Sequence, residues 1–308
     1  MHGKEIIMSM IEVNGVTKSF DGFKALDNLT LTVEKGSVYG LIGPNGAGKT
    51  TLIKNLCGIY KPDSGKILID YNNVYENTKI KENIIYISDE LFFYSTYSIK
   101  AIAKMYSELY PKWSWERYEN MKEVFKIDEK RKVRRLSKGM QKQVAFWLGI
   151  CTCPHVMILD EPVDGLDPVM RRNVWSLILS DVAEHGTTVL ISSHNLRELE
   201  DVCDHVGIMF NGKVVLQKSL DDVKGNIHKV QTAFENDFPE EIINDTEILH
   251  KSEFGSVVTL IAKGSSEEIK KAISKYNPLI LDILPLTLEE VFIYELGGLG
   301  YEFENIIL

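Results

Sequence analysis

The sequence has no apolar run that approaches the roughly twenty residues a helix needs to cross a bilayer. Its beginning lacks the apolar core of a secretory signal, and we interpret residues 1–9 as an N-terminal extension. It contains no internal repeat and no low-complexity tract. These absences argue against a membrane-spanning protein and a repeat protein, so we expect a cytoplasmic chain.

Positive charge is also scarce, because 35 Lys and Arg stand against 44 Asp and Glu and the formal net charge is -9. Proteins that bind nucleic acid usually carry a basic face, so we expect no nucleic-acid partner. The four cysteines show neither paired Cys-x-x-Cys spacing nor histidines at ligand spacing. They are Cys57, Cys151, Cys153 and Cys203. We interpret them as small buried hydrophobic residues, with a metal site as the alternative.

The sequence does contain a phosphate-binding pattern, GPNGAGKTT, which begins at Gly43. Its glycines let backbone N–H groups turn toward phosphate oxygens, and the helix expected from about Lys49 adds the positive end of its dipole. An apolar run at 38–42 precedes the pattern, as expected of a buried parallel strand. Lys49 would reach the β- and γ-phosphates, while the Thr50 hydroxyl would ligate Mg²⁺. The residues predicted to bind ATP or GTP here are Asn45, Gly46, Ala47, Gly48, Lys49, Thr50 and Thr51. A glycine-rich turn without ligand is the alternative.

Strand and helix signals alternate along most of the chain, which predicts a mostly parallel sheet with helices on its faces. Between residues 98 and 135 the pattern is helical instead and indicates an inserted helical subdomain. Beyond about Leu220, strand-like runs precede a helix that begins with a capping box formed by Ser265 and Glu268. Apolar residues at helical spacing over 269–276 predict that one face of this helix is buried.

A further apolar run, at 156–159, ends in two adjacent carboxylates, Asp160 and Glu161. Ligands of open α/β sheets bind at the carboxyl ends of the strands. Adjacent residues of an extended backbone point in different directions, so the two acids can take different roles. We expect Asp160 to hold the Mg²⁺ shell and Glu161 to polarise the water that attacks the γ-phosphate. A solvated acidic turn after a strand is the alternative.

The segment LSKGMQ, from Leu136 to Gln141, comes just before a helix whose apolar residues indicate burial. The order of GPNGAGKT, LSKGMQ, ILDEP, GLD and SSH resembles the ATP-binding subunit of ABC transporters over roughly residues 10–220. The resemblance implies an α/β P-loop NTPase of ABC type with a mixed sheet core, an antiparallel β subdomain and a helical subdomain inserted at about residues 90–140. Residues 221–308 would form a small C-terminal α+β extension.

The resemblance also implies roles for single residues. Ser137 and Gly139 of one copy would meet the γ-phosphate held in the glycine-rich loop of a second copy. His194 would hydrogen-bond the γ-phosphate and help hold the attacking water, and Phe20 would stack on the adenine ring. The plainer alternatives are a helix N-cap for Ser137, an ordinary surface or core histidine at 194, and core packing for Phe20.

One position departs from the family pattern. Family members usually carry a glutamine that contacts Mg²⁺ and water and senses the membrane subunit, whereas this chain reads IYISDE from Ile85 to Glu90. Asp89 occupies that place, and we expect it to ligate Mg²⁺, because a carboxylate is a better ligand than an amide. In the family, the region of the aromatic-rich run at 91–97 receives a short helix of the membrane subunit. Core packing under the inserted helices is the alternative.

These features predict an ATPase that uses ATP and Mg²⁺ and works as a clamp, in which two copies close on ATP and reopen after hydrolysis. Its partners would be a second ATPase subunit, as a homodimer, and an integral membrane permease, which places the chain at the inner face of the cell membrane. The stretch at 285–292 is similar to the ends of drug, antibiotic and peptide exporter ATPases, which favours export of such a substrate or of a lipid-like one.

Two other classes compete with this interpretation. A soluble ABC-type ATPase would act on ribosomes, DNA or cofactor assembly, but such proteins usually carry a second cassette, zinc modules or coiled coils, which this chain lacks. A P-loop kinase or GTPase is not supported, because no Asn-Lys-x-Asp guanine reader is present and LSKGMQ would have no role.

Overall fold

The computed structural model describes residues 8–94, 96–225, 227–236, 238–284, 286–287, 289–290 and 293. Their contacts divide the chain into two units. The first extends to Asn195 and includes Val202–Gln217, and the second comprises Leu196–Asp201 and the residues from Lys218 onward. Among the described residues, every helix is too short or too polar to span a membrane.

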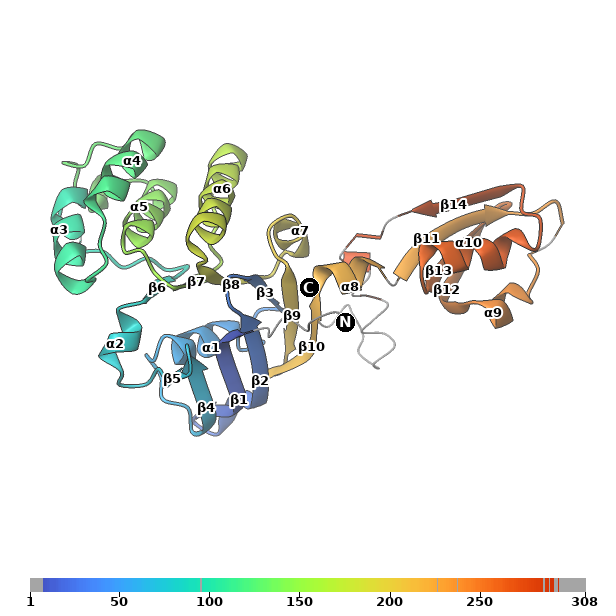
Figure 1. Ribbon diagram of the computed structural model, residues 1–308, viewed down its shortest axis with the longest axis horizontal. Helices are drawn as coiled ribbons and strands as arrows, with labels where there is room; N and C mark the ends of the chain where they lie inside the picture. The colour runs from blue at the N-terminus through green and yellow to red at the C-terminus, as the bar shows by residue number, and fades with distance from the viewer. Residues whose placement is uncertain are drawn as a thin grey trace, which may run out of the picture. The chain divides into compact units, whose positions relative to one another are not determined.

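A four-stranded antiparallel sheet forms one part of the first unit (Figure 1). Its strands lie in the order β2-β1-β4-β5, with the bounds β1 Ser9–Phe20, β2 Phe23–Glu34, β4 Ser64–Ile69 and β5 Asn72–Asn73. Along β2 the burial alternates, so that Leu29, Leu31 and Val33 are buried while their neighbours are not. This period of two places one face of the sheet on the core. The antiparallel β subdomain implied by the resemblance is therefore present.

A six-stranded sheet forms the centre of the same unit, in the order β10-β9-β3-β8-β7-β6. Its strands are β3 Val38–Ile42, β6 Ile84–Ile87, β7 Val156–Asp160, β8 Thr188–Ser193, β9 His205–Phe210 and β10 Lys213–Ser219. Strands β9, β3, β8, β7 and β6 pair in parallel, and every residue of β3, β7 and β8 is buried. Because the strands are parallel, the segments that follow β3, β6, β7 and β8 meet at one edge of this sheet.

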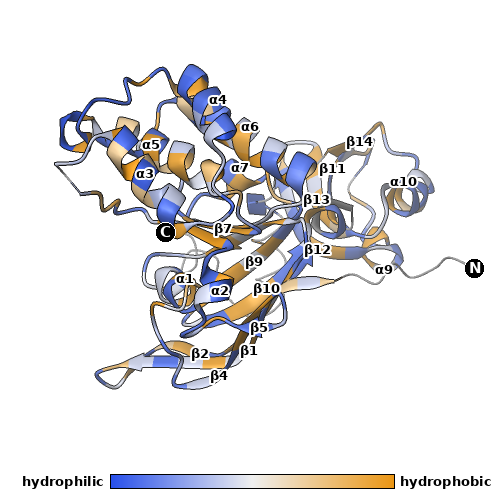
Figure 2. Ribbon diagram, turned by 60° about the vertical axis from the view of Figure 1, so that its left-hand side comes forward, coloured by the Kyte–Doolittle hydropathy of each residue, from blue (hydrophilic) through white to orange (hydrophobic). Residues whose placement is uncertain are grey.

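Helices cover this sheet, and α3, α4 and α5 form a helical subdomain. The helices of the first unit are α1 Lys49–Leu56, α2 Thr78–Lys81, α3 Ile99–Leu109, α4 Trp115–Phe125, the 3-10 turn Val133–Arg135, α5 Lys138–Cys151 and α6 Pro168–His185. Helix α5 packs against α3, α4 and α6, and its Trp147 stacks on Tyr118 with ring centroids 4.8 Å apart. Both α3 and α4 lie within the insertion expected from the sequence. Figure 2 shows hydrophobic residues along β7 and β9 and many polar residues on α4.

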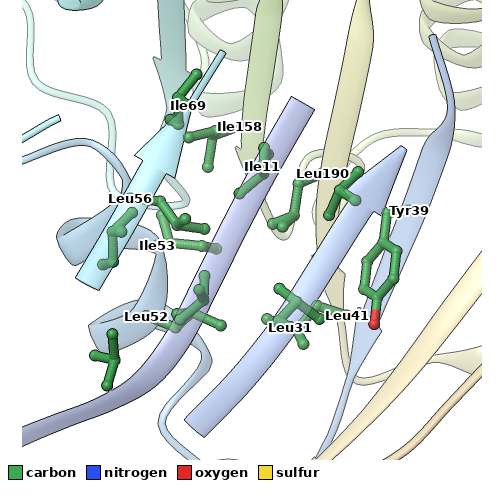
Figure 3. Packing of buried hydrophobic residues seen from close by; sticks show 14 of the residues in the cluster. Ile11, Leu31, Tyr39, Leu41, Leu52, Ile53, Leu56, Ile69, Ile158 and Leu190 are labelled. Carbon is green, nitrogen blue, oxygen red and sulfur yellow. The ribbon is translucent and has the colours of Figure 1, made fainter. Parts of the chain in front are cut away.

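The main core lies between the two sheets of the first unit, where α1 contributes Leu52, Ile53 and Leu56, all fully buried (Figure 3). They pack in one cluster with residues from both sheets, such as Ile11 and Ile158. Burial of each such side chain contributes roughly 1.5–3 kcal/mol. This packing fixes α1, and with it the position of the loop that leads into the helix from β3.

The second unit contains a four-stranded antiparallel sheet in the order β12-β13-β11-β14. Its elements are α7 Leu196–Leu199, α8 Leu220–Gly225, β11 Ile227–Ala233, α9 Ile242–Asp245, β12 Glu247–Phe254, β13 Val257–Lys263, α10 Ser266–Ser274 and β14 Ile280–Leu284. The predicted capping box of Ser265 and Glu268 begins α10 and is confirmed. The predicted burial of one helix face is confirmed by Ile269 and Ile273, which join Val230 and the rest of a separate core.

Candidate functional site

The glycine-rich loop connects β3 to α1 and is shaped by glycines that other residues could not replace. Gly46 and Gly48 have φ angles of 83° and 104°, in the left-handed region that favours glycine. A Cβ atom on Gly48 would also lie 2.4 Å from the Ala25 carbonyl oxygen. Gly48 is the N-cap of α1, and no side chain caps this helix. Its first N–H groups are therefore available to an anion in the adjoining cavity.

A cavity of about 440 Å³ lies against this loop and the carboxyl ends of the strands. Its lining residues are Phe20, Phe23, Ala25, Pro44, Asn45, Gly46, Gly48, Lys49, Thr50, Thr51, Asp89, Asp160 and Glu161. Among the loop residues predicted to bind phosphate, Ala47 does not line it, because Ala47 is buried and its N–H donates to the Pro44 carbonyl at 3.1 Å. The volume and the mixture of aromatic, cationic and acidic groups suit a nucleoside triphosphate.

Lys49 lies folded into the loop. Its ammonium donates to the carbonyl oxygens of Gly43 and Pro44 and lies 3.9 Å from Oε1 of Glu161. Burial lowers the pKa of Lys49, while the carboxylates of Glu161 and Asp160 oppose that shift. A buried ammonium held by two carbonyls and a carboxylate marks the place where a phosphate group would supply negative charge.

The donor set around Asp160 fits a magnesium ion. The Thr50 hydroxyl donates to Oδ2 of Asp160 at 3.0 Å, and the Ser192 hydroxyl donates to Oδ1. Mg²⁺ prefers oxygen ligands and is usually held by one or two protein groups together with water and phosphate oxygens. Among the described residues, no group of three or more His, Cys, Asp and Glu side chains is arranged to hold a metal. Thr50 and Asp160 would therefore hold the ion jointly with the nucleotide.

The cysteines do not contribute to such a site. Cys151 and Cys203 are buried, as expected from the sequence, and Cys57 packs partly buried against the main core. Cys153 is also only partly buried, so the interpretation as fully buried hydrophobic residues is wrong for Cys57 and Cys153. All four are free thiols, and burial raises the pKa of Cys151 to about 12.

Glu161 lines the nucleotide cavity, and His194 lies beside it. Nδ1 of His194 lies 3.0 Å from Oε2 of Glu161, while the other carboxylate oxygen faces Lys49. Burial raises the pKa of Glu161, and the hydrogen bond to His194 opposes the shift. A raised pKa makes this carboxylate a stronger base than an exposed glutamate, as general base catalysis at neutral pH requires. The three residues predicted to be catalytic, Lys49, Glu161 and His194, are thus close together.

Asp89 follows β6 and lines two cavities. It lines the nucleotide cavity together with Asp160, and it lines a second cavity of about 530 Å³ on the side of α5. Its Oδ1 atom forms an ion pair with the ammonium of Lys142 at 3.4 Å, and its side chain is 51% exposed. Asp89 is therefore placed at the metal region and is also paired with a lysine, a contact that the sequence analysis does not foresee.

The Asp89→Gln variant is expected to need a higher Mg²⁺ concentration for half-maximal ATPase activity, because an amide is a weaker magnesium ligand and cannot form the ion pair with Lys142. Titration of the ATPase rate with Mg²⁺ measures the effect. Glu108→Gln, which changes an exposed carboxylate on α3, is the control. An unchanged rate and an unchanged Mg²⁺ dependence would show that Asp89 does not serve the metal.

Phe20 also lines the nucleotide cavity. Its ring is 39% exposed, so it is not a core residue as the plainer alternative has it. It contacts the edge of Tyr60 with centroids 5.3 Å apart, and the ammonium of Lys18 lies 5.4 Å from the ring centre. An aromatic ring that is supported from one side and exposed on a cavity can stack on a planar base. Phe23, which the sequence analysis omits, lines the same cavity.

Ser137 and Gly139 do not line the nucleotide cavity. They lie at the N-terminus of α5, on a separate cavity of about 490 Å³ that also includes Gly165 and Asp167. The Ser137 hydroxyl accepts a hydrogen bond from the Met140 N–H at 3.2 Å, so the helix N-cap interpretation is confirmed. A single chain therefore does not bring the tip of α5 to the glycine-rich loop.

Three of the aromatic side chains at 92–97 are exposed, while Phe93 is only half-buried. Phe92 is 86%, Tyr94 53% and Tyr97 45% exposed, and the three rings contact one another in sequence. These exposures contradict core packing beneath the inserted helices for Phe92, Tyr94 and Tyr97, and the half-buried Phe93 is left outside this cluster. An exposed aromatic cluster of this kind is typical of a protein-binding surface.

Two residues that the sequence analysis did not identify take part in the site. Ser192 donates to Asp160, and its hydroxyl and carbonyl oxygens each accept from the Glu161 N–H at 3.2 Å. Lys142 donates to the carbonyl oxygen of Glu161 at 2.6 Å. Ser192 lies within the SSH segment, where its position at the end of a buried strand could have marked it. The sequence signal for Lys142 is a lysine just before the largely apolar stretch of α5 at 144–151.

Comparison with known proteins finds similarity to ATP-binding proteins of ABC transporters. The family model described as "ABC transporter" matches residues 26–164. The ABC transporter ATP-binding protein YtrB of Bacillus subtilis is 35% identical over 289 residues, which cover 94% of this chain and 99% of YtrB. The bacitracin transport ATP-binding protein BcrA of Bacillus licheniformis is 33% identical over 219 residues, covering 70% of this chain and 72% of BcrA. A solved ATP-binding subunit of an ABC transporter superposes with a TM-score of 0.65 at 27% identity, covering 70% of this chain and 91% of that one.

Proposed function

Since this chain belongs to the ABC transporter family of ATP-binding subunits and is an ATPase, we propose that two copies form an ATP-driven clamp that powers a separate membrane permease. In this clamp, each ATP is held between the glycine-rich loop of one copy and the tip of α5 of the other. Closure brings the γ-phosphate to both sides at once. Hydrolysis removes this shared ligand, so the closed state loses its advantage and the copies separate.

The separation of Ser137 and Gly139 from the nucleotide cavity carries this proposal. Both residues lie on a cavity of their own, at the end of a helix whose dipole favours an anion, and the loop residues of the same chain do not line it. Asp167, which follows Glu161 closely in the chain, lies on the same cavity. A second copy related to the first by a two-fold axis would complete both nucleotide sites at once.

The chemistry follows from the groups that meet at Glu161. The carboxylate would accept a proton from the attacking water, and its raised pKa favours that transfer near neutral pH. His194, hydrogen-bonded to the same carboxylate, would orient the water and contact the γ-phosphate. Lys49 would leave its carbonyl partners and neutralise charge on the β- and γ-phosphates. Mg²⁺ held by Thr50, Asp160 and Asp89 would supply further charge stabilisation of the phosphates.

The membrane permease would dock on the exposed aromatic cluster at Phe92, Tyr94 and Tyr97. A short helix in such a contact buries its apolar side chains against the rings. The chain would then lie at the inner face of the cell membrane. The name of the relative BcrA, a bacitracin transport protein, together with the stretch at 285–292, supports export of a drug, an antibiotic, a peptide or a lipid-like substrate. Half of the latter stretch, namely Pro285, Leu288, Val291 and Phe292, lies outside the described residues.

Copurification tests the transport assignment directly. The full chain, tagged and expressed from its own genomic locus, is expected to retain a multi-span membrane protein after detergent extraction. The Phe92→Ser variant is expected to lose that partner while keeping its ATPase activity, because Phe92 is 86% exposed and is not among the residues that line the nucleotide cavity. Recovery of ribosomes or DNA instead of a membrane protein would favour the soluble ABC-type ATPase.

A further inference from the structure

Lys142 is a charged residue in a buried position. It lies in the second turn of α5, its side chain is only 6% exposed, and it begins a run of residues that are mostly buried and apolar, such as Val144 and Phe146. Buried lysines are rare unless their ammonium groups are paired, because desolvation of the charge is costly. A lysine in this position therefore needs a compensating set of acceptors.

The acceptors come from two loops at the carboxyl edge of the central sheet. The Lys142 ammonium donates to the carbonyl oxygen of Glu161 at 2.6 Å and to that of Asp164 at 3.1 Å. Its third contact is the ion pair with Oδ1 of Asp89 at 3.4 Å. A lysine ammonium has three N–H donors, and each finds one acceptor here. One side chain of α5 thus connects the segment after β7 with the segment after β6.

The hydrogen bond from Lys142 to the Glu161 carbonyl acts on an unusual backbone conformation. Glu161 has a φ of 47°, in the left-handed region that a residue with a Cβ rarely adopts. Such a conformation costs of the order of 1–3 kcal/mol and persists only when neighbouring groups hold it. The Glu161 N–H donates to the carbonyl and hydroxyl oxygens of Ser192, both at 3.2 Å, and its carbonyl accepts from Lys142. The peptide groups on both sides of this Cα are therefore held.

We propose that Lys142 is the positioning residue for Glu161. Its ammonium holds the Glu161 carbonyl, and this keeps the backbone in the left-handed conformation that directs the carboxylate to His194 and Lys49. The hydrogen bond to the Asp164 carbonyl also fixes the turn that leads to Gly165. The ion pair connects Lys142, and through it this segment, to Asp89. The inference rests on the proposed role of Glu161 as the base.

A positioning role and a purely structural role predict different kinetics. When a base is misplaced, the transition state loses stabilisation while ground-state binding of the nucleotide remains, so kcat falls and KM does not change. Misplacement by about 1 Å can reduce a rate by roughly 100-fold. A structural defect instead lowers the melting temperature and the fraction of active protein, and gives no specific dependence on an added amine.

The test uses the full-length Lys142→Gln, Lys142→Arg and Lys142→Ala variants, with Lys104→Ala on the exposed face of α3 as control. For Lys142→Gln we expect kcat to fall by about 10- to 100-fold, with the KM for ATP and the affinity for a non-hydrolysable ATP analogue unchanged. Lys142→Arg, which keeps charge and N–H donors, should retain more activity than Lys142→Gln. Methylammonium should raise the rate of Lys142→Ala, because it restores an ammonium donor, whereas tetramethylammonium, which has no N–H group, should not.

The outcomes separate this inference from the proposed function. If Glu161→Gln is inactive but the Lys142 variants turn over like the wild type, the positioning role is wrong and the base assignment stands. If Glu161→Gln remains active, the proposed function itself fails. A loss of activity at Lys142 that follows the loss of folded protein, without rescue by methylammonium, would assign a structural role and overturn the inference. Failure of all three variants to fold would do the same.

Discussion

Replacement of Glu161 by glutamine is expected to abolish most ATP turnover and to trap a dimer in the presence of ATP and Mg²⁺. The amide has nearly the same size as the carboxylate and remains close to Lys49 and His194, but it cannot accept a proton from water. Loss of a general base reduces rates by about 10²- to 10⁴-fold. Because ATP would bind without being consumed, the closed state should accumulate. Phosphate release measures turnover, and size-exclusion chromatography with light scattering measures the dimer.

The matched control is Glu116→Gln, which makes the same chemical change on the exposed side of α4 and should leave turnover and assembly as in the wild type. A Glu161→Gln variant that hydrolyses ATP at the wild-type rate would remove Glu161 from the mechanism. A variant that binds ATP and remains monomeric would instead leave the base assignment intact and contradict the clamp.

Replacement of Lys49 by alanine is expected to have the largest effect on nucleotide binding. The ammonium is buried among carbonyl groups and the carboxylate of Glu161, so its charge acts on a phosphate with little screening. Truncation of one partner of a buried, hydrogen-bonded charge pair costs about 2–5 kcal/mol, which corresponds to a weakening of roughly 30- to 4,000-fold in Kd. Isothermal titration with ATP and with AMP measures it.

The comparison with AMP provides an internal control for this prediction. AMP lacks the β- and γ-phosphates that Lys49 is expected to contact, so its weaker binding should change little in Lys49→Ala. Lys66→Ala, an exposed lysine of β4, should bind both nucleotides like the wild type. Equal losses for ATP and AMP would indicate a collapsed loop instead of a lost phosphate contact.

Much of the fold follows from local patterns in the sequence. The buried strands β3 and β7 are continuous apolar runs, and the capping box at Ser265 marks the start of α10. Helix α6 is the clearest omission from the sequence analysis. It buries few side chains, chiefly Val174, Trp175 and Ile178, so its apolar periodicity is weak, although Asp167 followed by Pro168 is typical of a helix start. Its packing against α5 is seen only in the structure.

In the candidate site, too, some residues can be predicted from the sequence and others cannot. Residues whose chemistry is tied to a motif, such as Lys49, Thr50 and Asp160, lie together on one cavity, as the motif order indicates. Lys142 could not be identified in this way, because two of its three partners are backbone carbonyl groups, which any residue carries. The left-handed backbone of Glu161 is likewise invisible in its side-chain type. Contacts made through the backbone depend on how whole helices and strands are arranged, and only the structure shows this arrangement.

The central claim is that one ATP is shared between two copies of the chain. The most direct test is a structure of the Glu161→Gln variant with ATP and Mg²⁺. Our account predicts a two-fold dimer in which each γ-phosphate contacts Lys49 of one copy and Ser137 of the other. A structure in which ATP occupies the loop of Lys49 while Ser137 of every copy remains remote from any phosphate would contradict it.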